Sequence, residues 1–487
     1  MKTRIADLMH TSGVAFGTSG ARGLVSSMTD RVCYAYTVAF LQHLEQENRV
    51  LPNSRVATAG DLRSSTPRIL SAVHSAIIDR GYSPVYCGRI PSPAVALYGL
   101  SHSIPSIMVT GSHIPDDRNG IKFNSPEGEI LKSDEASVRM QEVELPDKFS
   151  ESGSLNASVD LDEDASAARE YMHRYTDVFP FGMLWGMHLG LYAHSAVGRD
   201  LMQRIYERLG AKVTRFGDSD VFIPVDTEAI RPEDVALASN WAQEHGFDAI
   251  VSTDGDSDRP LISDEHGRWL RGDVAGILCA KQCGADVVVT PVSSNSAVEA
   301  CGAFSRVVRT KIGSPYVIEA MQQAISDGVC VVGYEANGGF LTGSKFFISG
   351  GVLEPLPTRD AVIVHLAVLR ASVMSGLKIS RLVADLPQRF TWSDRLQEFP
   401  SDVSKTRLNE FECGGFGAIV DAFRELGSVA SVDWTDGMRL TFAGGDVVHA
   451  RASGNAPELR CYTESSTELG ARELNKRAIE LMRKWRD

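Results

Sequence analysis

The chain has 487 residues, of which 43% are hydrophobic and 23% charged, as is usual for a folded protein in water. This length exceeds what a single hydrophobic core serves, so we expect about three or four domains. The net charge of −13 argues against a nucleic-acid-binding protein, because phosphate backbones demand a basic surface. A small anionic ligand is still compatible with it, because a few arginines can form a local binding site.

No secretory signal or membrane span is expected. The first 13 residues contain no long apolar run, and the longest strongly apolar segment, residues 361–369, is too short for a bilayer and carries His365. The eight cysteines are scattered and form no CxxC pair, which favours reduced thiols buried in the core. We therefore predict a cytoplasmic protein, monomer or dimer, that binds neither nucleic acid nor membrane.

The first three quarters of the chain alternate short buried strands with amphipathic helices. The expected order is strand 55–59, helix 67–80, strand 106–110; strand 188–193, helix 200–209, strand 249–252; and strand 286–290, helix 315–325, strand 330–333. Such alternation is typical of doubly wound α/β units. The sequence therefore predicts a series of α/β domains.

After about residue 376 the pattern changes. Two antiparallel strands, 438–442 and 447–451, are joined by two glycines, and a closing helix follows over 469–485. The acidic, serine-rich stretch 150–164 has the composition of a linker. We predict three similar mixed-sheet α/β domains and a C-terminal α+β domain around a central cleft, with the division 1–155, 156–265, 266–375 and 376–487.

A serine follows directly after one predicted strand, in Thr110-Gly111-Ser112-His113. Ligands of open α/β sheets gather at the carboxyl ends of strands. A serine hydroxyl is a weak nucleophile unless it is activated, and Lys122 or His113 could assist it. The loop thus indicates a nucleophile, with a simple capped turn as the alternative.

Three aspartates, Asp254, Asp256 and Asp258, follow another predicted strand. Carboxylates this close disfavour joint ionisation unless a cation neutralises them. Hard oxygen ligands select Mg²⁺ or Ca²⁺, and Mg²⁺ is usual where a phosphate completes the shell. An EF-hand is disfavoured because residues 260–262 are expected to form a strand. The alternative to a metal site is an exposed acidic turn.

A third loop places Glu335 and Asn337 beside two glycines after a strand. A carboxylate and an amide in this setting suit hydrogen bonds to neighbouring sugar hydroxyls. A glycine-rich turn without a ligand is the alternative.

A fourth loop combines Arg451, Ser453 and Gly454 with Arg460 close behind. Guanidinium groups and backbone N–H groups are what a phosphate monoester needs. Surface arginines on a β-hairpin are the alternative. Arg22 is a further loop arginine that is uninformative by itself.

Together these loops resemble the α-D-phosphohexomutase superfamily, which contains phosphomannomutases, phosphoglucomutases and phosphoglucosamine mutases. The resemblance covers essentially the whole chain, with every motif in the order of the family. It implies that the catalytic residues are Ser112, Lys122, Arg22, His113 and Arg259; that the magnesium ligands are Ser112, Asp254, Asp256 and Asp258; and that the substrate-binding residues are Lys311, Gly313, Glu335, Asn337, Arg451, Ser453, Gly454, Asn455 and Arg460.

The resemblance implies a phosphohexomutase, an intramolecular phosphotransferase that interconverts hexose 1-phosphate and hexose 6-phosphate. A phosphoserine at Ser112, a hexose 1,6-bisphosphate that also activates the enzyme, and Mg²⁺ belong to this expectation. The loop at Glu335 most resembles a bacterial branch labelled phosphomannomutase, which implies mannose. Gly111 departs from the family, which usually shows alanine there.

Four alternatives remain open at this point. A phosphoglucomutase or a phosphoglucosamine mutase would differ only in the hexose. A metal-dependent sugar phosphatase would release inorganic phosphate, and a silent sugar-phosphate sensor would bind without reaction. A haloacid-dehalogenase-type nucleophile at Asp254 fits poorly, because Asp258 stands where that motif has Thr or Val.

Overall fold

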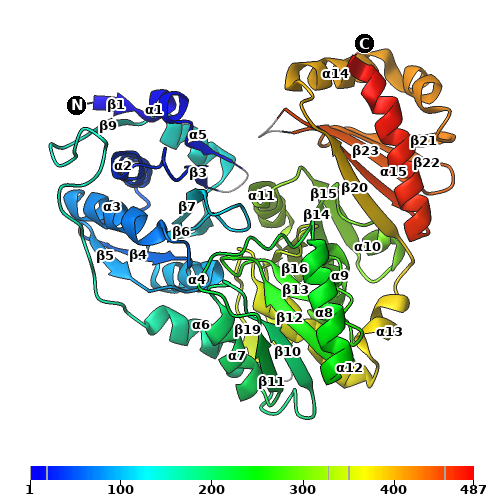
Figure 1. Ribbon diagram of the computed structural model, residues 1–487, viewed down its shortest axis with the longest axis horizontal. Helices are drawn as coiled ribbons and strands as arrows, with labels where there is room; N and C mark the ends of the chain where they lie inside the picture. The colour runs from blue at the N-terminus through cyan, green and yellow to red at the C-terminus, as the bar shows by residue number, and fades with distance from the viewer. Residues whose placement is uncertain (1, 18–19, 327, 349–350, 454–456, 487) are drawn as a thin grey trace. The chain divides into compact units, whose positions relative to one another are not determined.

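The computed structural model describes residues 2–17, 20–326, 328–348, 351–453 and 457–486. They form two compact units (Figure 1). The larger unit consists of Met1–Asp286 and Gly313–Leu382, and the smaller unit of Val287–Ile312 and Val383–Asp487. The predicted division into four domains at residues 155, 265 and 375 stays a prediction.

The first sheet of the larger unit has seven strands in the order β2-β3-β7-β6-β4-β5, with β8 paired to β7. The strands are β2 (Ala15–Phe16), β3 (Ala21–Leu24), β4 (Arg55–Gly60), β5 (Ser83–Tyr86), β6 (Ser106–Val109), β7 (Arg118–Ser125) and β8 (Gly128–Glu129). The accompanying elements are β1 (Lys2–Arg4), α1 (Ile5–Ser12), α2 (Asp30–Gln46), α3 (Thr66–Asp79), α4 (Ser92–His102), α5 (Lys132–Met140) and β9 (Glu142–Glu144). Strand β4 pairs in parallel with β5 and β6, whereas β7 is antiparallel to β6.

Along the chain, successive strands run outward from β4 to the edge strand β5 and then continue on the opposite side of β4, at β6 and β7. The connection from β4 through α3 leads to β5 on one side, and the connection through α4 returns to β6 on the other. Because such crossovers are right-handed, α3 and α4 cover opposite faces of the sheet (Figure 1). The carboxyl ends of β4 and β6 therefore form a topological switch point, where open α/β sheets bind ligands. Asp61 follows β4 and Ser112 follows β6 shortly after the strand ends.

The second sheet repeats this arrangement in the order β11-β10-β12-β13. Its elements are α6 (Ser166–Thr176), β10 (His188–Tyr192), α7 (Arg199–Arg208), β11 (Lys212–Phe216), α8 (Pro232–His245), β12 (Ala249–Thr253) and β13 (Pro260–Ile262). Strand β10 pairs in parallel with β11 and β12, so a second switch point lies at the carboxyl ends of β10 and β12. Asp254 is the first residue after β12.

The larger unit is completed by elements from the later part of the chain. They are α9 (Gly272–Gln282), α11 (Ser314–Ala324), β16 (Val331–Tyr334), β17 (Phe340–Thr342), β18 (Phe346–Ile348), β19 (Gly351–Leu353) and α12 (Ala361–Ser375). Strands β16 and β17 form an antiparallel pair, and Glu335 lies in the turn between them. The next helix, α13 (Ile379–Ala384), contains the point where the sequence passes from the larger unit to the smaller one.

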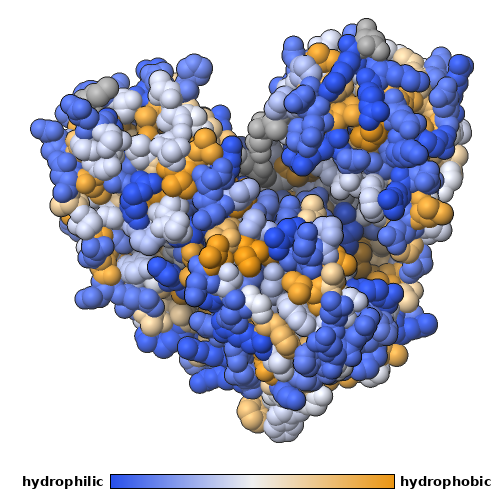
Figure 2. All heavy atoms as spheres, viewed as in Figure 1, coloured by the Kyte–Doolittle hydropathy of each residue, from blue (hydrophilic) through white to orange (hydrophobic). Residues whose placement is uncertain are grey.

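The smaller unit contains an antiparallel sheet in the order β20-β24-β23-β22-β21. Its elements are β14 (Val287–Pro291), α10 (Ala297–Ala300), β15 (Arg306–Thr310), β20 (Phe390–Leu396), α14 (Ser401–Phe423), β21 (Val429–Asp433), β22 (Met438–Phe442), β23 (Val447–Ala452), β24 (Leu459–Ser465), α15 (Glu468–Arg483) and a terminal 3₁₀ turn (Lys484–Arg486). Helix α15 buries Leu474, Ala478 and Met482 against this sheet. Its other face is mostly hydrophilic (Figure 2). The predicted α+β character of the C-terminal region is confirmed.

Two further observations concern membrane spans and cysteines. Among the described residues, no helix has the length and apolar content needed to cross a membrane. All eight cysteines are free. Only Cys33, Cys87, Cys279 and Cys461 are buried, however, and Cys413 is exposed, so the prediction of core thiols is wrong for the rest.

The first nine residues of helix α12, 361–369, are all buried, and the helix begins at a buried carboxylate. Asp360 caps the helix by accepting a hydrogen bond from the Val362 backbone N–H at 3.1 Å. The same carboxylate accepts hydrogen bonds from the hydroxyls of Tyr171, at 2.6 Å, and Tyr175. All three of these side chains are almost fully buried, so the helix start depends on this one acceptor.

We expect Asp360→Ala to lower the free energy of unfolding by about 3 kcal/mol, because it removes a cap and leaves two buried hydroxyls without their acceptor. Urea titration of the wild type and the variant measures this loss. The matched control is Asp402→Ala in the first turn of α14, where the carboxylate is exposed. A loss below about 1 kcal/mol is expected there, and an equal loss in both variants would contradict the role of Asp360.

Candidate functional site

Ser112 is fully buried at the first switch point and adopts a left-handed backbone conformation with φ of 58°. Its backbone N–H donates to Thr110 Oγ1 at 2.8 Å, and its hydroxyl donates to Asp254 Oδ2 at 2.6 Å. The serine loop and the aspartate loop, which are 142 residues apart in sequence, therefore meet at one point. A left-handed residue other than glycine is uncommon and points to a functional constraint.

The three aspartates converge as the sequence predicted. Asp254, Asp256 and Asp258 each place a carboxylate oxygen within 4.8 Å of the others, and all three are buried. The alternative of an exposed acidic turn is therefore wrong. Within the described part of the chain, Asp256 Oδ1 and Asp258 Oδ1 accept no hydrogen bond although both atoms are buried.

These carboxylates are compensated unequally by nearby cations. Lys122 Nζ lies 2.6 Å from Asp256 Oδ2 and 2.6 Å from Asp258 Oδ2. Despite their burial, Lys122 holds the pKa of Asp256 below its usual range, and Arg359 does so for the pKa of Asp258. Burial and the charges of its two aspartate neighbours instead raise the pKa of Asp254 well above its usual value.

The donor set fits a hard divalent cation. It consists of carboxylate oxygens with the Ser112 hydroxyl beside them, and two of the oxygens have no hydrogen-bond donor among the described residues. Mg²⁺ prefers this all-oxygen environment. Cysteine and histidine, which would favour zinc, are not members of the cluster.

Arg22, Arg259 and His113 surround the serine and the aspartates. Arg259 Nε lies 3.9 Å from Asp254 Oδ2 and 3.8 Å from Asp258 Oδ1. Burial and the positive charges of Arg259 and Arg359 lower the pKa of Arg22 to about 10.

His113 is held as a neutral hydrogen-bond acceptor. Its Nδ1 lies 2.9 Å from Arg259 Nη1 and 3.4 Å from Ser112 Oγ. Burial, with the charge of Arg259, lowers the pKa of His113 to about 3. Because Nδ1 accepts from Arg259, this histidine is poorly placed to take a proton from Ser112.

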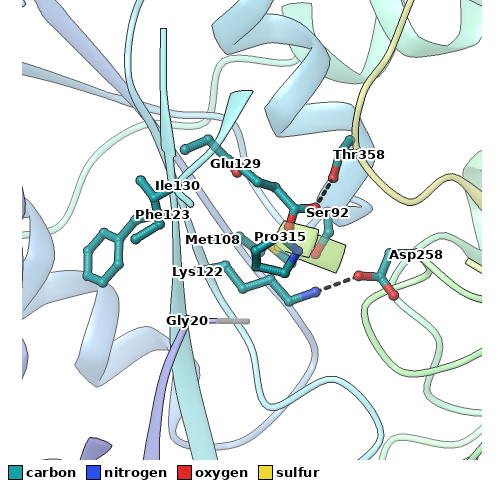
Figure 3. Close-up of a pocket in the computed structure, with 11 residues that line it drawn as sticks. Gly20, Ser92, Met108, Lys122, Phe123, Glu129, Ile130, Asp258, Pro315 and Thr358 are labelled. Carbon is teal, nitrogen blue, oxygen red and sulfur yellow. Dashed lines mark hydrogen bonds and ion pairs between the residues drawn. The ribbon is translucent and has the colours of Figure 1, made fainter. Parts of the chain in front are cut away.

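A small cavity borders Lys122 and Asp258 (Figure 3). Lys122 extends from β7 toward Asp258, while Glu129 accepts a hydrogen bond from Thr358 Oγ1 at 2.5 Å on another side of the cavity. Glu129 also accepts from Ser314 Oγ at 2.9 Å. The cavity thus has polar groups from several distant segments of the larger unit.

The turn after β16 contributes Glu335 and Asn337. Glu335 is buried and pairs with Arg359 at 3.4 Å, and Arg359 in turn lies 3.1 Å from Asp258 Oδ2. Asn337 uses its side-chain oxygen to accept the Gly339 backbone N–H at 2.9 Å, which closes the turn. The glycine-rich turn is therefore present, and it also places a buried carboxylate next to the aspartate cluster.

The fourth loop lies in the smaller unit. Arg451 on β23 and Arg460 on β24 are directly paired across the sheet, so their side chains share one face. Asp436 Oδ2 lies 2.9 Å from Arg451 Nε and also accepts the Ile312 backbone N–H at 2.9 Å. This carboxylate ties the segment that contains the exposed Lys311 to the arginine pair.

The remaining substrate-binding candidates have different surroundings. Ser453 is buried, and its backbone N–H donates to the Glu458 carbonyl oxygen at 2.9 Å. Gly313 precedes α11 with a φ of 133°, a conformation that favours glycine. Gly454 and Asn455 lie outside the described residues.

Sequence reasoning missed four residues that the structure places in or beside this site. They are Asp61, Arg63, Ser92 and Arg359. Ser92 donates to Asp256 Oδ2 at 2.5 Å. Asp61 and Arg63 follow a buried parallel strand, so the argument applied to the other loops could have found them. No such pattern marks Arg359, because it precedes an apolar helix and does not follow a buried strand.

Comparisons with known proteins match this chain to one family over most of its length. Models described as phosphoglucomutase/phosphomannomutase, alpha/beta/alpha domains I, II and III match residues 13–143, 170–267 and 271–390 respectively. The chain is 42% identical to a phosphomannomutase of Salmonella muenchen over 469 residues, which cover 96% of this chain and 95% of that protein.

Two further comparisons agree. A phosphomannomutase of Sinorhizobium fredii is also 42% identical, over 95% of this chain and 97% of its own length. The crystal structure of a putative phosphomannomutase from Thermus thermophilus superposes with a TM-score of 0.75 at 17% identity, covering 96% of this chain and 99% of that one. The last comparison supports the α/β fold of the three matched domains.

We expect Mg²⁺ to stabilise the wild type by about 2.7 kcal/mol when it is present at 100 times its dissociation constant. Asp256→Asn should abolish this gain, because it removes a buried carboxylate from the cluster. Asp264→Asn is the matched control, since Asp264 is also buried but, among the described residues, its carboxylate accepts hydrogen bonds from its own turn, at His266 and Arg268. Thermal unfolding with and without Mg²⁺ measures the effect. A gain that persists in Asp256→Asn would contradict a metal site here.

We expect the affinity for Mg²⁺ to rise with pH. The pKa of Asp254 is raised, so its carboxyl keeps a proton above the usual titration range of aspartate and must lose it when a cation binds. Where one proton is displaced, the affinity should change about tenfold per pH unit. Calorimetry in buffers of different ionisation enthalpy counts the released proton. An affinity independent of pH between about 5 and 8 would contradict the coupling.

Proposed function

Because the chain belongs to the phosphoglucomutase/phosphomannomutase family of phosphohexomutases, we propose that it moves a phosphoryl group between O1 and O6 of a hexose through a phosphorylated Ser112. The observation that carries this proposal is the 2.6 Å hydrogen bond from Ser112 Oγ to Asp254, inside a buried triplet of aspartates. The Ser112 hydroxyl thus lies in an enclosed place beside a candidate cation site, and phosphoryl transfer requires both.

In the proposed reaction, the bond from phosphorus to Ser112 Oγ breaks as a bond from phosphorus to the free sugar hydroxyl forms. The product is a hexose 1,6-bisphosphate. Its other phosphoryl group then returns to Ser112, so the serine is phosphorylated again and the phosphate has changed position. Lys122, at the border of the cavity, is the proposed general acid/base that exchanges a proton with the sugar hydroxyl in the two transfers.

The groups around Ser112 would stabilise the negative charge of the transferring phosphoryl group. A Mg²⁺ ion held by Ser112 and the three aspartates would neutralise part of this charge. Arg259 and Arg22 would add positive charge from the protein itself. The neutral His113 orients Arg259 by accepting its hydrogen bond at 2.9 Å.

Substrate recognition is proposed for the other loops. Glu335 would accept hydrogen bonds from sugar hydroxyls, with Asn337 keeping the turn closed. Arg451, Ser453 and Arg460 would hold the phosphate that is not reacting, since two arginines on one sheet face offer paired donors. We propose mannose phosphates as the preferred substrates, because the two relatives at 42% identity are phosphomannomutases.

We expect the wild type to convert mannose 1-phosphate to mannose 6-phosphate in the presence of Mg²⁺ and a trace of the 1,6-bisphosphate, and Ser112→Ala to lose this activity by at least about 1000-fold. Phosphorus NMR follows both phosphates directly. Ser404→Ala is the matched control, because Ser404 is a buried serine in α14 whose hydroxyl donates, within the described part of the chain, to the Pro400 carbonyl oxygen at 3.2 Å.

The same spectra separate the competing functions. Release of inorganic phosphate without isomerisation would identify a phosphatase, and unchanged sugar phosphates that still bind would identify a sensor. Full activity of Ser112→Ala would remove the phosphoserine from the mechanism.

We expect kcat/KM for mannose 1-phosphate to exceed that for glucose 1-phosphate. The two sugars differ only in the orientation of the hydroxyl at C2, so a site that hydrogen-bonds this group discriminates between them. Competition between the two substrates in one reaction gives the ratio. A ratio that favours glucose, or glucosamine 1-phosphate in a parallel competition, would assign the chain to a sister branch of the family.

A further inference from the structure

A buried arginine, Arg63, holds the loop that carries Ser112. It lies in the segment after β4, and its side chain has no exposed surface. Its Nη2 donates to the backbone carbonyls of Ser112 at 3.0 Å and Ile114 at 2.6 Å. Its Nη1 donates to the carbonyls of Pro115 at 2.8 Å and Arg118 at 3.1 Å. One guanidinium group thus fixes four backbone carbonyls. Three lie in the serine loop between β6 and β7, and the fourth lies at the first residue of β7.

Asp61 connects Arg63 to the backbone N–H of Ser112. Its Oδ2 accepts Arg63 Nε at 3.1 Å and also accepts the hydroxyl of Thr110 at 2.8 Å. The hydroxyl oxygen of Thr110 in turn accepts the backbone N–H of Ser112 at 2.8 Å. The carbonyl of Ser112 is therefore held by Arg63, and its N–H is held through Thr110 by the carboxylate that binds Arg63.

The same guanidinium group connects the serine loop to the aspartate loop. The ring of Phe222 stacks on Arg63, with Cζ at 3.7 Å from the ring centroid. Gly255, between two of the aspartates, packs so tightly here that a Cβ would lie 2.7 Å from the Phe222 ring and 2.7 Å from the Ser112 carbonyl oxygen. Displacement of Arg63 would therefore disturb both loops.

We propose that Arg63 is a positioning residue for phosphoryl transfer, which holds Ser112 in its left-handed conformation and in register with the three aspartates. This inference rests on the proposed function. Among the described residues, the hydrogen bonds of Arg63 go to the serine loop and to Asp61, and none goes to the sugar or phosphate loops. Its effect on catalysis is therefore indirect and acts through the geometry of Ser112.

Gly111 is explained by the same contact. A Cβ at this position would lie 2.7 Å from Cζ and 2.7 Å from Nε of Arg63. The guanidinium group cannot yield easily, because five hydrogen bonds and the Phe222 ring fix it. The glycine where the family usually shows alanine is thus the residue that leaves room for Arg63.

The test compares Arg63→Lys and Gly111→Ala with the wild type in the mannose 1-phosphate assay. We expect each variant to lower kcat about 100-fold, since a misplacement of about 1 Å costs this much, while KM changes less than about threefold. The fraction of phosphorylated Ser112, read by intact mass after incubation with the 1,6-bisphosphate, should fall in both. The double variant should be no slower than the slower single variant, because both changes break one contact.

Arg174→Lys is the matched control for burial. Arg174 is a nearly buried arginine of the same unit that donates to the Glu354 carbonyl oxygen at 2.8 Å and to Thr342 Oγ1 at 3.3 Å, away from the serine loop. We expect its variant to lose thermal stability but to keep kcat and the phosphorylation of Ser112 within about twofold. If Arg63→Lys does not fold, Gly111→Ala decides the question.

Each outcome bears on a different claim. Normal kcat and normal phosphorylation in Gly111→Ala, beside an active wild type, would overturn the role of Arg63. Equal losses in Arg63→Lys and Arg174→Lys would reduce that role to general stability and overturn it as well. A wild type that does not interconvert the two phosphates would overturn the proposed function, and this inference with it.

Discussion

The burial of negative charge at the end of β12 is the constraint on which the site depends. Three aspartates within 4.8 Å of one another cannot all remain ionised in a buried setting without compensation. Lys122 and Arg359 supply it for Asp256 and Asp258, and the pKa of Asp254 rises instead. Many of the contacts in the site therefore serve to hold these three carboxylates together in a buried place.

The compensating groups come from distant parts of the chain, and this links the loops. Lys122 belongs to β7 of the first sheet, whereas Arg359 precedes α12. Arg359 contacts Asp258 and Glu335 together, so the candidate cation site and the candidate sugar loop share one guanidinium group. The charge balance of the aspartates and the position of Glu335 are therefore coupled within the larger unit.

The two topological switch points explain why the candidate catalytic and metal-binding residues lie where they do. In both sheets the residues that follow the two central strands lie at a topological switch point. Asp61 and Ser112 lie at the first switch point, and Asp254 lies at the second. The hydrogen bond from Ser112 to Asp254 joins the two switch points. Ser112 adopts a left-handed conformation at this junction, where Arg63 holds its carbonyl and Thr110 holds its N–H.

The sequence by itself determined the α/β class, the positions of the strands and helices predicted from it to within one or two residues, and the serine, aspartate and glutamate loops. Periodicity and strand-to-loop transitions are local properties, so a single chain displays them. The tertiary structure alone decided which loops meet, that the aspartate turn is buried, and that Arg359 and Arg63 belong with it. Arg359 pairs with Asp258, 101 residues away in sequence, and Arg63 donates to Arg118, 55 residues away, and no local pattern encodes contacts over such separations.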